Sequence, residues 1–228
     1  CVYPNFKEIE KYTGVLKAQN FEIFQETLKE HHMADLADDF LFASGRLQTL
    51  CYKADIEGAL RTPGFAGFQL LDLHDFPGQG RALVGVLDPF WEGYVTPEEY
   101  STFCNKTVPL VRFPKMVWLN NETLNVPLEV AHFGEKPLQA ANITWEISNQ
   151  VGEKIAQGNF VKDLPVTNCI PAGNIEYSFS GIEKPTQLVV SAEVKETGSK
   201  NQWNIWVYPA KQETVDKQPY ITSALDNQ

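Results

Sequence analysis

Three side chains that could do chemistry gather at one point of the sequence. Asp72, His74 and Asp75 follow an apolar run that ends at Pro77-Gly78. Such a run, closed by polar residues and a Pro-Gly pair, is typical of a strand that is buried on both faces and ends in a functional loop. Because parallel strands carry chemistry at their carboxyl ends, these residues are candidates for a binding site. Alternatively, the two aspartates cap the loop and the histidine hydrogen-bonds locally.

Composition narrows the class of ligand. The chain has 228 residues, of which 43% are hydrophobic, enough for one or two domains with real cores. Its formal net charge is -10 and it contains no run of Lys and Arg, which argues against nucleic acid as a partner. The acidity is compatible with neutral ligands such as sugars. No apolar stretch approaches the roughly 20 residues that span a bilayer, so no membrane partner is expected.

No metal site and no cofactor are expected. The four cysteines are widely spread, without a Cys-x-x-Cys pair, which disfavours both a zinc site and a dense disulfide scaffold. His31 and His32 are adjacent, and adjacent side chains on a helix diverge by about 100°, so they do not converge on one ion.

Helical patterns precede the apolar run. Apolar side chains recur at helical spacing in three segments, with Ser44-Gly45 expected to separate the second from the third: 19–29, 33–43 and 46–60. A shorter helix is predicted after Asn5, with Glu8 close to a capping-box position and on the solvent side.

A last helix is predicted at Thr96-Pro97-Glu98-Glu99, which has the order of an N-cap, a first-turn proline and a box-closing glutamate. Before it lies the aromatic loop 88–94. Its Trp91 and Tyr94 could stack on sugar rings, although aromatic residues in such a segment are more often part of a core.

The second half of the chain has the pattern of a β-sandwich. Seven β-rich runs separated by turn signals follow a Pro-bracketed hinge at 109–114: 116–119, 124–133, 141–147, 154–160, 175–179, 187–194 and 203–208. This predicts an immunoglobulin-like sandwich without the Cys-Trp-Cys signature, with Trp145 and Trp206 as core anchors. Residues 210–228 are expected to be a linker or tail.

The segment Gly67–Phe76 resembles the last barrel strand of glycoside hydrolase family 2, the β-galactosidase and β-glucuronidase group. Asp72 stands at the family's Asn/Asp position and Asp75-Phe76 at its Asp-Phe pair, while Leu71 stands where a sugar-stacking Trp is frequent. The sequence from Leu70 to Asp88 is also similar to that of a bacterial subgroup of these enzymes. In such relatives, a segment like Val2–Asn5 directly follows the strand with the nucleophilic Glu.

The resemblance implies a multi-domain α/β plus all-β chain. Residues 1–113 would be the C-terminal part of a (β/α)8 TIM barrel, 114–209 an immunoglobulin-like β-sandwich and 210–228 a linker or tail. The parent protein would be a retaining β-glycosidase, periplasmic or secreted, with carbohydrate and the remainder of the parent chain, or a second copy, as partners. The candidate substrate-binding residues are Asp72, His74, Asp75 and Trp91.

The fragment itself is expected to be inactive. Retaining hydrolysis needs two carboxylates about 5 to 5.5 Å apart, and in this family both come from earlier strands, upstream of Cys1. Asp72 and Asp75 are three apart on a strand and point to opposite faces, so they cannot form the pair. The alternative is a self-contained, non-catalytic module that binds carbohydrate or only scaffolds a larger assembly.

Overall fold

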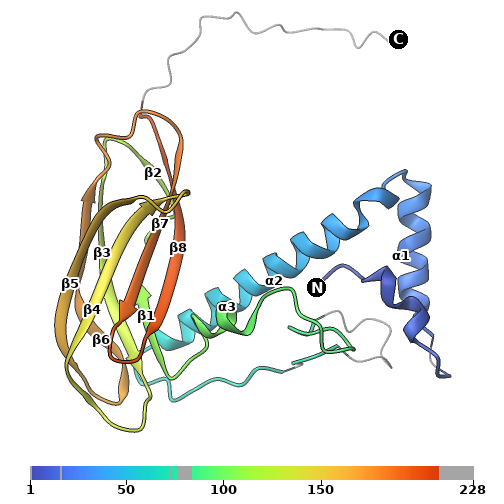
Figure 1. Cartoon of the computed structure of the whole chain (residues 1–228), viewed down its shortest axis with the longest axis horizontal. Helices are drawn as coiled ribbons and strands as arrows, with labels where there is room; N and C mark the ends of the chain where they lie inside the picture. Colours follow the sequence, from blue (N-terminus) through green and yellow to red (C-terminus); the bar gives the residue numbers. More distant parts are fainter. Residues whose placement is uncertain (1, 16, 72, 76–83, 211–228) are drawn as a thin grey trace, which may run out of the picture.

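The computed structural model describes residues 2–15, 17–71, 73–75 and 84–210. Over these residues the chain is a β-sandwich of two sheets, preceded by helices that extend away from it (Figure 1). The strands are β1 (Thr107–Val111), β2 (Val117–Leu119), β3 (Thr123–His132), β4 (Leu138–Asn149), β5 (Lys154–Leu164), β6 (Thr167–Ser178), β7 (Thr186–Val194) and β8 (Ser199–Tyr208). The helices are η1 (Phe6–Lys11), α1 (Gln19–Glu30), η2 (Ala34–Leu36), α2 (Ala37–Leu60) and α3 (Pro97–Ser101).

The two sheets have the strand orders β1-β3-β6 and β2-β8-β7-β4-β5. All pairs are antiparallel except β2 with β8. The prediction of a sandwich is confirmed, and its strand order is that of immunoglobulin-like domains, with β1, β3 and β6 facing a sheet built on β4, β7 and β8. β1 pairs with β3, so the sandwich begins at Thr107.

Alternation along each strand builds the core between the sheets. β7 and β8 bury every second residue, which is the period of a strand with one face in the core and the other in solvent. On β8, Trp203 and Ile205 point inward, so Trp206 points outward and is 37% exposed. The prediction that Trp206 anchors the core is therefore wrong, whereas Trp145 packs against the core as expected.

The expected barrel portion is contradicted. Residues 64–71 and 73–75 form no strand, and the one parallel pairing there is an isolated bridge between His74 and Leu87. Leu71 is 74% exposed, which rules out a strand buried on both faces. The physical reason is that a buried parallel strand needs hydrogen-bonded neighbours along its length on both sides. Among the described residues, this segment pairs only at His74, with Leu87 on one side.

The predicted break at Ser44-Gly45 is also wrong, because α2 runs through both residues. The Ser44 hydroxyl donates back to the carbonyl of Phe40, which keeps a polar side chain compatible with the helix. Gly45 lies beneath the Tyr94 ring, where a Cβ would be only 2.3 Å from Tyr94 Cγ. Glycine here serves close packing rather than a helix end.

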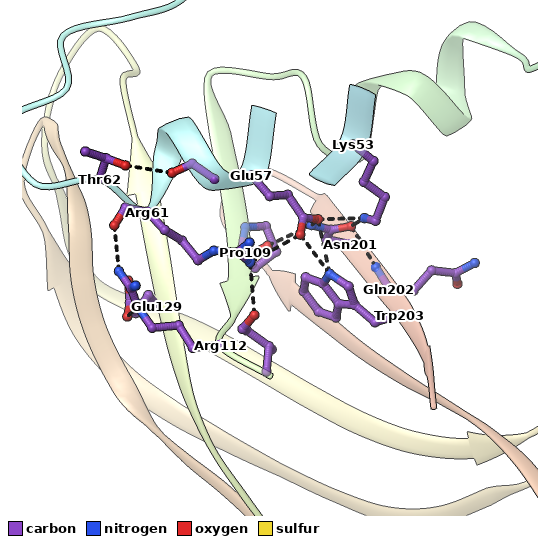
Figure 2. A network of polar contacts seen from close by, with 12 residues as sticks. Lys53, Glu57, Arg61, Thr62, Pro109, Arg112, Glu129, Asn201, Gln202 and Trp203 are labelled. Atoms are coloured by element: carbon purple, nitrogen blue, oxygen red, sulfur yellow. Dashed lines mark hydrogen bonds and ion pairs between the residues drawn. The ribbon is translucent and has the colours of Figure 1, made fainter. Parts of the chain in front are cut away.

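The C-terminal half of α2 docks onto the sandwich. Ile56 and Leu60 form a second small core with Val108 and Leu110 of β1, so β1 is buried on both faces. Beside it, the buried Glu57 accepts hydrogen bonds from Asn201 and Trp203 of β8, and it pairs with Lys53 and Arg61 (Figure 2). The Arg112 guanidinium also donates a hydrogen bond to the carbonyl oxygen of Arg61. In the described part of the chain, no helix is long and apolar enough to cross a membrane.

Candidate functional site: a carboxylate-rich loop beside Trp91

The loop 84–95 lies beside α2 and holds the buried carboxylate of Asp75. Its Oδ1 accepts the backbone N–H groups of Val84 and Gly85, both at 2.7 Å. α2 fixes the same point, because Gln48 and Tyr52 both donate to the carbonyl oxygen of Val84. Burial raises the pKa of Asp75, although the two backbone hydrogen bonds oppose that rise. Asp75 thus organises the loop rather than facing solvent. This agrees with the alternative in which the aspartate caps the loop.

Trp91 is the exposed aromatic side chain of the loop, and the half-buried His74 packs beside it. The His74 ring lies 4.7 Å from the Trp91 ring, and its Nδ1 is 2.7 Å from the carbonyl oxygen of Asp75. Trp91 is 62% exposed and has a φ of 68°, a left-handed conformation that few residues other than glycine adopt. Three of the four predicted site residues are therefore neighbours, and the fourth, Asp72, lies outside the described residues.

The buried carboxylate of Asp88 holds Trp91 in this conformation. Its Oδ1 accepts the N–H groups of Phe90, at 2.8 Å, and of Glu92, at 2.9 Å. Its carbonyl accepts the N–H of Trp91, and its own N–H donates to the carbonyl of Glu92. An aspartate that closes a tight turn on its own backbone in this way is a common turn device.

Glu8 joins this loop from η1, 80 residues earlier in the sequence. We call Glu8, Asp88 and Glu92 the carboxylate cluster, because one oxygen from each lies within 4.8 Å of the others. Glu8 is 1% exposed. Burial, and then the neighbouring Asp88, raise the pKa of Glu8 to about 7, while Lys11 acts in the opposite direction.

Aromatic side chains surround the cluster. The Tyr12 ring meets the Phe90 ring edge-on at 5.4 Å, and Lys11 Nζ lies 4.7 Å from the centre of the Phe90 ring. Burial, and then the charges of Glu8, Asp88 and Asp75, raise the pKa of Tyr12 to about 12. Burial and the same carboxylates also raise the pKa of Tyr94. Both phenol groups therefore stay neutral beside the cluster.

Sequence reasoning missed Glu8 and Asp88. The helix pattern places Glu8 on the solvent side of η1, which the structure contradicts. Asn5 does cap this helix as predicted, by accepting the N–H of Lys7. Nothing in the local sequence links Glu8 to Asp88. The only available signal was the Asp-Pro pair at 88–89, which is typical of a turn.

A second concave surface lies on the outer face of the five-stranded sheet. This groove, of about 1180 Å³, is bounded at one end by Glu98 and Glu99 of α3. Its sheet side chains are polar, among them Asn142, Thr144 and Ser191. Trp145 also lines it, although it shares the inward parity of the buried Ile143 and packs against the core.

One comparison with known protein families matches the sandwich. The model of a family described as a domain of unknown function (DUF8488) matches residues 122–209, which hold β3 to β8. No curated protein matches. Domain 1 of VCBP3 from Branchiostoma floridae is 8% identical with a TM-score of 0.30, and the match covers 46% of this chain and 98% of that one.

The adhesin domain of Epf from Streptococcus pyogenes is 16% identical with a TM-score of 0.27, and the match covers 45% of this chain and 33% of that one. None of these matches is described as a glycoside hydrolase. Residues 122–209 are thus similar to a family whose function is unassigned.

Proposed function

We propose that this chain is a non-catalytic module that contacts carbohydrate through Trp91, within a larger retaining β-glycosidase. The observation that carries the proposal is the exposed Trp91 ring beside His74, on a backbone turn that Asp88 closes. Sugar-binding sites pair an apolar aromatic face with polar groups that orient the hydroxyls. Here the His74 ring is the polar neighbour. The membership in a glycosidase rests on the sequence resemblance of Gly67–Phe76 alone.

The burial of the carboxylates supports the absence of catalysis. Glu8 and Asp88 lie close together, and a carboxyl with a pKa of about 7 beside a second carboxylate is the electrostatic arrangement of an acid/base pair. However, both residues are buried, whereas a catalytic pair must flank the glycosidic bond of a bound sugar. Asp75 is buried as well, and its Oδ1 is taken by backbone N–H groups.

A scaffolding role is the second candidate, and a different observation favours it. One stripe of α2 is apolar and exposed, with Leu47, Leu50, Cys51 and Ala54 at helical spacing. Leu71 and Leu73 are exposed as well. Exposed apolar surface of this kind is typical of a site that another protein covers. The proposed partner is the remainder of a parent glycosidase chain.

Saturation-transfer NMR with the full chain tests the carbohydrate contact. The probes are methyl β-galactoside, methyl β-glucoside, methyl β-glucuronide and their β-linked disaccharides. We expect transfer to at least one probe from the wild-type protein, and its loss in Trp91→Ala. The matched control is Trp206→Ala, which removes another exposed indole from the sandwich and should retain the transfer.

The outcomes separate the two candidates. Equal loss in both variants, or no transfer to any probe, would reject the carbohydrate contact and leave scaffolding. The same samples should not hydrolyse aryl β-glycosides. Turnover that disappears in Glu8→Gln would show that the module is catalytic after all.

A further inference from the structure

The carboxylate cluster has more negative charge than its surroundings balance. Glu8, Asp88 and the nearby Asp75 are all buried. Within the described ranges, Lys11 is the cationic side chain that contacts the cluster, with its Nζ 3.3 Å from Glu8 Oε1 and 3.9 Å from Glu92 Oε1. Burying carboxylates without an equal counter-charge is strongly unfavourable. A bound cation or a proton on one carboxyl would offset this charge.

One buried oxygen of the cluster has no partner. Glu8 Oε1 contacts Lys11, and Asp88 Oδ1 accepts two backbone N–H groups, but Glu8 Oε2 has no hydrogen bond. Glu8 and Asp88 face each other, and two ionised carboxylates have no proton to share. Because unsatisfied buried polar atoms are rare, an ion or a proton must occupy this position.

We propose that Glu8, Asp88 and Glu92 bind a divalent cation of the calcium type. Hard cations take oxygen ligands at about 2.3 to 2.6 Å, so two ligands of one ion are at most about 5 Å apart. The oxygens of the cluster, within 4.8 Å of one another, meet this limit. The cluster contains neither His nor Cys, the ligands that zinc prefers, and Ca²⁺ tolerates irregular carboxylate sites completed by water.

The geometry also provides an entry path and a function for the ion. Glu92 is exposed, so a hydrated ion meets this carboxylate first. The Lys11 side chain is about half exposed and can swing outward as the ion enters. The bound ion would join η1 to the loop 84–95, which carries Trp91. It would therefore hold together two segments that are distant in sequence.

Terbium luminescence on the full chain tests the site, since Tb³⁺ substitutes for Ca²⁺ and is sensitised by nearby aromatic rings such as Trp91. We expect saturable luminescence that excess Ca²⁺ abolishes. Glu92→Gln should weaken binding at least fivefold. Lys11→Met should tighten it, because the competing ammonium is gone. Glu22→Gln, an exposed position on α1, is the matched control and should change nothing.

Glu8→Gln separates a cation from a shared proton. The amide keeps the shape of the side chain and removes its charge, so cation binding should fall at least tenfold, with circular dichroism confirming the fold. Saturable binding that Glu8→Gln leaves intact would overturn the proposal. An absence of saturable binding to the wild type, or equal behaviour of Glu92→Gln and Glu22→Gln, would do the same.

Discussion

Trp203 donates its indole Nε1–H to both carboxylate oxygens of Glu57, at 3.1 and 3.0 Å, and thereby joins β8 to α2. Both residues are buried. The same carboxylate accepts from Asn201 at 2.8 Å and pairs with Lys53 at 2.7 Å. Glu57 is therefore the polar centre of the contact between α2 and β8, beside the apolar contact that Ile56 and Leu60 make with β1 (Figure 2).

Glu57→Ala should destabilise the chain by about 3 kcal/mol, because it leaves the Trp203 N–H buried without its acceptor and removes the counter-charge of Lys53. Burial already lowers the pKa of Lys53, and Glu57 opposes that shift. Urea unfolding followed by tryptophan fluorescence measures the change. Asp55→Ala, at an exposed position of the same helix, should stay within about 0.5 kcal/mol. Equal effects would refute the importance of this contact.

Gly45→Ala and Gly58→Ala should change the stability of the chain in opposite directions, although both residues lie inside α2. Replacing an interior helix glycine by alanine favours the helix by about 1 kcal/mol. At Gly45 the new Cβ would meet the Tyr94 ring, so a net loss of about 1 to 3 kcal/mol is expected. At Gly58 nothing lies within 4 Å, so a gain is expected. Thermal unfolding of the two variants measures these changes. A stabilised Gly45→Ala variant would show that the Tyr94 ring does not pack against Gly45.

Glu99 should contribute pH-dependent stability through α3. Its hydrogen bond from Arg46, and then that from the Thr96 N–H, lower the pKa of Glu99. A carboxyl group whose pKa is lower in the folded state than in the unfolded state stabilises the fold at pH values above its ordinary pKa of 4.5. This stabilisation is lost as the pH falls through the pKa of the folded state. The side chain is exposed, so Glu99→Gln should cost only about 0.5 kcal/mol at pH 7.

The difference between wild type and Glu99→Gln should shrink below pH 4. Unfolding at pH 7 and pH 3.5 measures it, with Glu98→Gln as a neighbouring control that keeps the cap. A difference that does not depend on pH would mean that the carboxylate charge is irrelevant.

The isolated chain should associate as its concentration rises. The exposed stripe of α2 contains Leu47 and Leu50, and a second copy can cover it when no other protein does. Light scattering should show less association for the double variant Leu47→Lys, Leu50→Lys. The control pair Val151→Lys, Val161→Lys changes equally exposed residues of the sandwich and should have no effect. A wild-type protein that stays monomeric would contradict this prediction.

The sequence by itself determined the elements whose signals are local. The seven β-rich runs became β2 to β8, because alternation and turn residues act within a few positions. The same holds for the Asn5 cap and for the capping box of Thr96 and Glu99, whose partners are two or three residues apart. The number and spacing of these strands predicted the immunoglobulin-like sandwich, but not β1, which lies where the sequence indicated a hinge.

Only the tertiary structure decided the remainder. The apolar run around Leu71 has the composition of a strand, but a strand forms only with neighbours to pair with, and the described chain provides a single bridge, from His74 to Leu87. Glu8 reads as solvent-facing in its own helix, and it is buried because a loop 80 residues later folds over it. Trp206 and Trp203 differ only in strand parity, so which of them lies in the core depends on the register that β8 adopts against β7.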